Sequence, residues 1–184
     1  GPTYPPYEKM KIVANDVAQE VFKVVQGLKY QNWVKLRSAQ SELKLKVRQP
    51  TDAQIAYAKA VLAKPAGQKP EHVNERAYAD RTIQTRAEWP NQISIVMQTF
   101  GIGELGVAAI PFEVFTQTGL DIKRRSPFKS TFTVELANGS YGYLPTPEQH
   151  KLGGYETWLG TNRVEVDASV KITNELMKLF KQIK

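Results

Sequence analysis

The chain contains no cysteine and only two histidines in 184 residues. The lack of cysteine excludes disulfide bridges and thiolate metal ligands. His72 and His150 stand far apart, and neither belongs to a ligand-spaced pair or to a His-Glu-x-x-His motif. We predict a surface position for both, with His72 in the first turn of a helix and His150 in a loop. The sequence therefore supplies no complete metal site of its own.

Long apolar runs are also missing. No stretch approaches the ~18 apolar residues of a membrane span, and no signal peptide opens the chain. The chain starts with Gly1-Pro2-Thr3 and no initiator methionine, so we expect native upstream sequence to precede it. A composition that is 41% hydrophobic and 23% charged is typical of a globular domain. The length fits one domain, or a large piece of one.

The net charge of +7 raises the question of nucleic-acid binding. The cations Lys44, Lys46 and Arg48 alternate with the apolar residues between 43 and 47, as on the wet side of a half-buried strand. No aromatic-rich RNA-binding motif and no helix-turn-helix signature accompanies them. We therefore predict no nucleic-acid partner, and only steeply salt-dependent binding would support one.

The spacing of apolar residues predicts mixed helix and strand. Spacings of three and four predict helices over residues 8–28, 51–62 (with Thr51 as N-cap), 70–89, 112–125 and from 168 onward. The side chains expected to face inward from the last helix are Val170, Leu176, Met177, Phe180 and Ile183. Alternation predicts strands over 43–47, 93–97, 105–110 and 128–136, the middle two forming a hairpin. Helices and strands alternate without repeats, which indicates the α/β class, with a mixed α+β fold as the alternative.

The segment from Gly101 to Gly106 matches the dinucleotide-binding fingerprint as a string of letters. That fingerprint needs a helix directly after the glycines, because the pyrophosphate lies on the helix N-terminus. A strand is predicted here instead. The match is therefore a coincidence.

Residues 110–156 hold the candidate site. Glu113 follows a buried-type strand and a proline, and the preference for carboxylates in the first turn of a helix offers a purely structural explanation for it. The other explanation is that the end of the strand delivers Glu113 into a cleft. Tyr143 and Tyr155 stand in turns rich in glycine and proline. The residues alone predict a pocket and no particular chemistry.

A series of short motifs follows in fixed order: IPFEVF from residue 110, IKRRSP from 122, VELANG from 134, GYLPT from 142 and GGYE from 153. With these motifs, residues 77–183 resemble the C-terminal end of the catalytic domain in the neutral and alkaline ceramidase family, particularly its shorter bacterial members. The resemblance implies two parts, a segment 1–76 that continues a catalytic domain from missing upstream sequence and a ceramidase-like part 77–184.

The resemblance also implies roles for three residues. Family members hold zinc with two histidines, a glutamate and a tyrosine, and the last two correspond to Glu113 and Tyr143. Tyr155, twelve residues after Tyr143, corresponds to a tyrosine that lines the scissile amide, and we expect it to donate a hydrogen bond to the developing oxyanion. The zinc histidines belong to upstream motifs that neither His72 nor His150 matches. Phe112 stands where the family often has a smaller residue, and we expect it to narrow the site.

The implied function is zinc-dependent hydrolysis of the N-acyl amide of ceramide or a related lipid, giving a sphingoid base and a fatty acid. The chain alone is expected to be inactive, with the upstream segment of the same protein as its partner. A membrane surface remains a second candidate partner. The family resemblance suggests a secreted, periplasmic or membrane-associated location. Two alternatives remain: a related hydrolase acting on another amide or ester, and a non-catalytic binding or interaction domain that lacks the zinc histidines.

Overall fold

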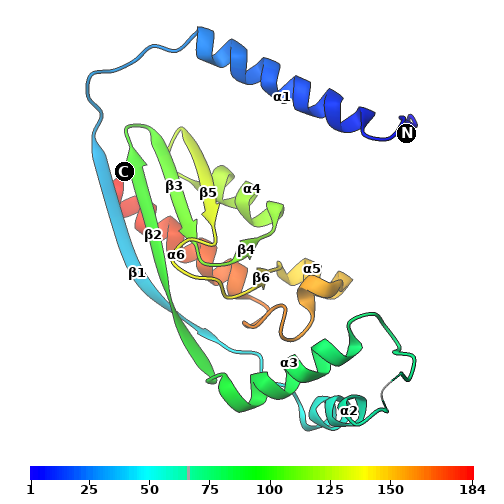
Figure 1. Ribbon diagram of the computed structural model, residues 1–184. Helices are drawn as coiled ribbons and strands as arrows, with labels where there is room; N and C mark the ends of the chain where they lie inside the picture. The colour runs from blue at the N-terminus through cyan, green and yellow to red at the C-terminus, as the bar shows by residue number, and fades with distance from the viewer. Residues whose placement is uncertain (66) are drawn as a thin grey trace. The chain divides into compact units, whose positions relative to one another are not determined.

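The computed structural model describes residues 1–65 and 67–184, which fall into two compact units, 1–34 and 35–184 (Figure 1). The first unit holds α1 (Glu8–Gln26), which confirms the predicted first helix. None of its residues is buried. Its apolar face, which includes Met10, Val13, Val17, Val21 and Val24, is exposed. The sequence boundary near residue 76 marks where the family resemblance begins, and it stays a prediction.

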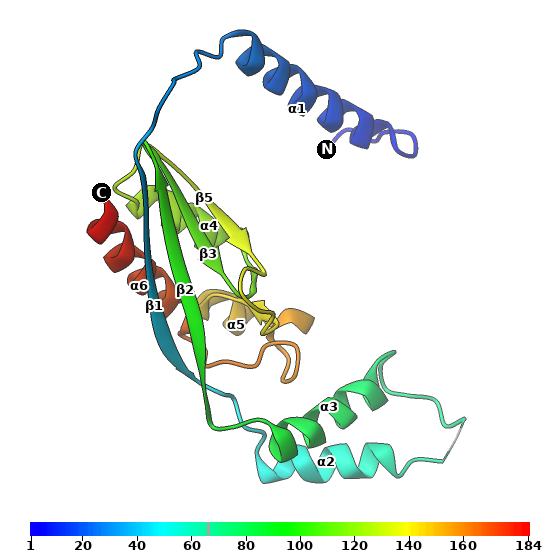
Figure 2. The ribbon, with the colours of Figure 1, turned by 60° about the vertical axis from the view of Figure 1, so that its left-hand side comes forward.

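The second unit is built on a four-stranded sheet in the order β1-β2-β3-β5 (Figure 2). Its strands are β1 (Leu36–Lys46), β2 (Gln92–Ile102), β3 (Leu105–Ile110) and β5 (Ser130–Glu135). β2 runs antiparallel to both β1 and β3, whereas β3 and β5 are parallel. The predicted hairpin and the α/β class are confirmed. Strands β1 and β2 are longer than the segments 43–47 and 93–97 that the alternation predicted. Because a strand follows Gly103, the dinucleotide fingerprint is indeed a coincidence.

One face of the sheet is covered by α6 (Ala168–Ile183), which contacts β1, β2 and β3. The core lies between them, with Leu45, Ile95, Leu176 and Phe180 all fully buried. The other face of the sheet keeps large apolar side chains exposed, namely Phe100, Ile102, Phe132 and Val134. The strands thus carry apolar side chains on both faces of the sheet. Within the described residues, only the face that packs on α6 is buried.

The last helix begins where predicted, and its buried side chains include Leu176, Met177, Phe180 and Ile183. The prediction for Val170 is wrong, because 46% of its surface is exposed. Val170 is off the helical stripe that runs through Ala168, Ile172 and Leu176, so it points away from the sheet.

Two helices are inserted between β1 and β2. The first, α2 (Asp52–Leu62), has the predicted Thr51 N-cap, with a reciprocal capping box to Gln54. The second, α3 (Glu75–Glu88), starts five residues later than predicted. His72 therefore lies in the turn before the helix, not in its first turn. The start is fixed at Glu75, whose buried carboxylate accepts hydrogen bonds from Lys64 and Tyr57.

The predicted helix over 112–125 starts later, as α4 (Thr116–Arg125). Glu113 and Val114 form a short strand, β4 (Glu113–Val114), which pairs in parallel with β6 (Tyr143–Leu144). The helix starts only after this strand, because residues 113 and 114 are extended and paired with β6, and the Glu113 amide donates to the carbonyl of Gly142, 3.0 Å away. The first-turn explanation for Glu113 is therefore wrong.

The loop predicted around His150 is also wrong, since residues 147–152 form α5 (Pro147–Leu152). A capping box from Thr146 and a proline at the first position start this helix. His150 is half-buried, so its predicted surface position is corrected as well. A single 3₁₀ turn, η1 (Tyr155–Thr157), follows. Among residues 1–65 and 67–184, no helix has the length and apolar character needed to span a membrane.

Candidate functional site

The pairing of two short strands brings the first two predicted site residues together. Glu113 stands opposite Tyr143 in the parallel register of β4 and β6. In a sheet, directly paired residues point to the same face. Both side chains accordingly line one pocket. Residues 30 positions apart in sequence therefore share a site because of this register.

The third predicted residue joins them from η1. The hydroxyl groups of Tyr143 and Tyr155 are 3.0 Å apart and share a hydrogen bond, and their rings meet edge to face at 5.5 Å. The bond to Tyr155 raises the pKa of Tyr143 above its ordinary value, and the Glu113 carboxylate and burial raise it further. Tyr143 is thus held as a neutral phenol between a partner hydroxyl and a carboxylate.

A polar bridge behind the pocket fixes the backbone of Tyr143. Its carbonyl accepts a hydrogen bond from the side-chain amide of Asn162 (3.0 Å), and its own amide donates to the carbonyl of Thr161 (3.0 Å). The Asn162 side chain in turn accepts from Arg48, 2.7 Å away. Arg48 is half-buried, and burial lowers its pKa. The prediction that Arg48 lies on a solvated face is therefore wrong.

Gly142 makes the close approach at this point possible. Its φ is +88°, and a Cβ added there would lie 2.3 Å from the carbonyl oxygen of Thr161. No side chain fits in that space. The glycine in the GYLPT motif thus serves the geometry that places Tyr143 opposite Glu113.

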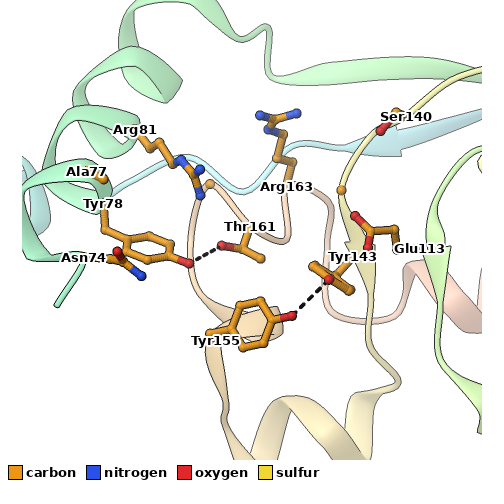
Figure 3. A pocket seen from close by; sticks show the side chains of 12 residues that line it. Asn74, Ala77, Tyr78, Arg81, Glu113, Ser140, Tyr143, Tyr155, Thr161 and Arg163 are labelled. Carbon is orange, nitrogen blue, oxygen red and sulfur yellow. Dashed lines mark hydrogen bonds between the residues drawn. The ribbon is translucent and has the colours of Figure 1, made fainter. Parts of the chain in front are cut away.

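The pocket itself has a volume of about 520 Å³ (Figure 3). The other lining residues come from α3 and the residue before it (Asn74, Ala77, Tyr78 and Arg81), from the loop after η1 (Gly160, Thr161 and Arg163) and from the segment before β6 (Ser140 and Gly142). The Tyr78 hydroxyl accepts a hydrogen bond from Thr161 (3.0 Å), which ties α3 to this loop. The volume is within the usual range for small-molecule sites.

Two arginines in this wall were missed by the sequence reasoning. The guanidinium of Arg81 lies over the ring of Tyr78, with 5.2 Å to the ring centroid, and that of Arg163 lies over Trp89 at 4.4 Å. Burial, and secondarily the charge of Arg81, lower the pKa of Arg163. Nothing in the spacing of the two arginines predicts that they meet, because one belongs to α3 and the other follows η1.

Phe112 does not narrow the pocket, contrary to expectation. Its side chain is fully buried in the core and packs on Tyr141, with ring centroids 5.7 Å apart. Alternation along the chain explains this, since Phe112 and Glu113 point to opposite sides. Neither His72 nor His150 lines the pocket.

The donor atoms present fit part of a metal site. A carboxylate and a phenol oxygen are both zinc ligands by type, and Glu113 and Tyr143 hold them on one face. Within the part of the chain that the structure describes, no group of three or more His, Cys, Asp or Glu residues is gathered closely enough to hold a metal. These two residues would therefore supply some of the ligands, and further ligands would have to come from elsewhere.

Fold and pocket together define a mixed α/β unit with an oxygen-rich site between α3, the β4–β6 pair and the loop after η1. No protein-family model and no curated protein matches the chain. Solved structures do. Neutral ceramidase from Pseudomonas aeruginosa superposes with a TM-score of 0.53 and 15% identity, over 79% of this chain and 28% of that one. A ceramidase complexed with C2 gives 0.51 and 14%, over 79% and 29%.

At these identities the similarity establishes a ceramidase-like fold and nothing about chemistry. The chain spans less than a third of the ceramidase chains that it matches. The fold expected from the motifs is thus confirmed at the level of a partial domain. The roles of Glu113, Tyr143 and Tyr155 are not tested by it.

Proposed function

We propose that this chain is the C-terminal part of a zinc-dependent amidohydrolase domain, which hydrolyses the N-acyl amide of ceramide or a related lipid. The observation that carries the proposal is the Glu113–Tyr143–Tyr155 cluster, which lies in one pocket of a ceramidase-like fold. These are the three residues that the family resemblance selects. The products would be a sphingoid base and a fatty acid.

Two unfilled apolar surfaces favour a larger domain. The second face of the sheet exposes Phe100, Phe132 and Val134, and α1 exposes an apolar stripe along its length. Exposed apolar patches mark contact surfaces for other polypeptide segments, membranes or ligands. An upstream segment of the same protein is the occupant that we propose, and it would also bring the missing histidines.

In the assembled site Glu113 and Tyr143 would hold zinc, which when bound supplies a Lewis acid and acidifies water. Tyr155 would donate its hydroxyl hydrogen to the oxygen of the scissile carbonyl as negative charge develops there. Asn162 and Thr161 keep Tyr143 in place through its backbone. The remaining pocket wall would hold the substrate near these groups.

Activity of the full-length protein tests the role of Tyr155. The substrate is a fluorogenic short-chain ceramide analogue, and wild type is compared with Tyr155→Phe. Loss of one donor to the oxyanion typically costs ~10²–10³ in kcat. Tyr141→Phe is the matched control, because Tyr141 packs on Phe112 outside the pocket and should keep wild-type activity.

Equal activity of wild type and Tyr155→Phe would remove Tyr155 from the chemistry. Absence of any hydrolysis by the wild-type full-length protein, on amides and esters alike, would favour the non-catalytic binding domain. Hydrolysis of esters or other amides without ceramide cleavage would favour the related hydrolase.

A further inference from the structure

The α3 side of the pocket carries two positive charges that no acidic side chain balances. No carboxylate of the described residues lies within ion-pairing distance of Arg81 or Arg163. Elsewhere in the unit, Arg86 is paired with Asp52, and Arg125 with Asp121. Glu113 is the acidic residue that lines the pocket, so the lining keeps an excess of positive charge.

Both guanidinium groups are held in place by aromatic rings. Arg163 stacks on Trp89 and Arg81 lies over Tyr78, which leaves their N–H edges available for a ligand. The Arg81 stem passes Gly160, where an added Cβ would lie 3.0 Å from the Arg81 Cβ. In Figure 3 Arg81 extends from α3 toward the loop that carries Thr161 and Arg163, with Glu113 on the opposite side of the pocket. The positions of the two cations are thus built into the wall.

A concave site with two fixed guanidinium groups attracts and orients oxyanions. We propose that Arg81 and Arg163 form an oxyanion subsite, which binds a carboxylate or phosphate group carried by an acyl amide. The amide itself would lie at Tyr143 and Tyr155. The placement of the amide rests on the proposed function, whereas the oxyanion subsite does not. An N-acyl amide that also carries an anionic group should therefore bind more tightly than an uncharged amide such as ceramide.

Binding to the 184-residue chain tests the subsite without any need for zinc or hydrolysis. The probes are N-hexanoylglycine, its uncharged counterpart N-hexanoylglycinamide, and inorganic phosphate, each titrated by NMR or calorimetry at low salt. We expect saturable binding of N-hexanoylglycine, about tenfold tighter than that of the glycinamide, because charge-assisted hydrogen bonds to the carboxylate are lost in the amide. Phosphate should compete with it.

Variants locate the binding. Arg81→Gln and Arg163→Gln should each weaken N-hexanoylglycine binding about tenfold and leave the glycinamide unaffected. Arg76→Gln is the matched control, since Arg76 belongs to the same helix, is exposed and lies outside this pocket. Arg81→Lys, which keeps the charge but loses the planar fork, should fall between wild type and Arg81→Gln. Thermal unfolding of each variant checks that the fold is intact.

Equal affinity for the charged and uncharged probes would overturn the proposal, as would no saturable binding at all. A loss in Arg76→Gln as large as in Arg81→Gln would overturn it too, because it would mean a general charge effect. Phosphate binding without N-hexanoylglycine binding would keep the subsite but overturn its assignment to an acyl amide. None of these outcomes bears on zinc binding, which is measured separately.

Discussion

Replacing Gly142 by alanine is expected to disturb the backbone that positions Glu113 and Tyr143 and to destabilise the fold. The left-handed backbone at φ +88° costs an alanine about 1–2 kcal/mol. The added Cβ would also lie 2.3 Å from the carbonyl oxygen of Thr161, so the backbone on one side has to move. That carbonyl accepts the amide of Tyr143, and the Gly142 carbonyl accepts the amide of Glu113. Strain and lost hydrogen bonds together should destabilise the protein by about 3 kcal/mol or more.

The assay is thermal unfolding of wild type, Gly142→Ala and a matched control. Since 1 kcal/mol shifts the midpoint by about 2–4 °C in a protein of this size, Gly142→Ala should lower it by about 6–12 °C. Gly153→Ala is the control. Its φ of +80° and ψ of −154° also lie in a region almost restricted to glycine, but an added Cβ meets nothing within 4 Å. It should lower the midpoint by clearly less than Gly142→Ala, because no clash with a neighbouring carbonyl is added to the backbone strain. Equal shifts for the two variants would refute the argument that close packing around Gly142 positions Tyr143.

Three other perturbations follow from the same structure. The pKa of Tyr143 is raised in the folded state, so the free energy of unfolding should be constant near neutral pH and fall as the pH rises above about 10. Urea unfolding at several pH values measures this fall, which should be smaller in Tyr143→Phe. The same pH dependence in Tyr143→Phe and wild type would contradict the shared hydrogen bond. Leu176→Ala should cost about 2–5 kcal/mol, because this side chain is fully buried. In the 184-residue chain, without the proposed upstream segment, Val17→Ala should change the free energy of unfolding by less than about 0.5 kcal/mol, because 59% of Val17 is exposed. A large loss would mean that α1 packs on another surface of this chain.

Much of the fold was predictable because local chemistry decides it. Thr51 caps its helix with Gln54 as a capping box requires, and Leu176 and Phe180 lie on the apolar stripe of α6 as their spacing predicts. The helix starts at residues 70 and 112 were wrong for a different reason. Long-range contacts fix both, since Glu75 accepts from Lys64 and the Glu113 amide pairs with Gly142. Such partners are invisible to spacing alone.

The candidate site divides in the same way. Glu113, Tyr143 and Tyr155 were selected by their motifs, and the β4–β6 register and one hydroxyl pair bring them together. Arg81 and Arg163 carry no local signal, because α3 and the loop after η1 meet only in the folded unit. The half-buried position of Arg48 was mispredicted because of a local signal. The alternation of cations with Leu45 and Val47 is typical of the solvent-exposed side of a strand.

The central claim is that Glu113 belongs to a zinc site, and the zinc content of the full-length protein tests it most directly. Wild type, Glu113→Ala and the control Glu148→Ala, an exposed carboxylate on α5, would be purified in parallel and their metal measured. We expect one zinc per chain in wild type and in Glu148→Ala, and a large loss in Glu113→Ala. No zinc in the wild-type protein, or full zinc in Glu113→Ala, would contradict the claim.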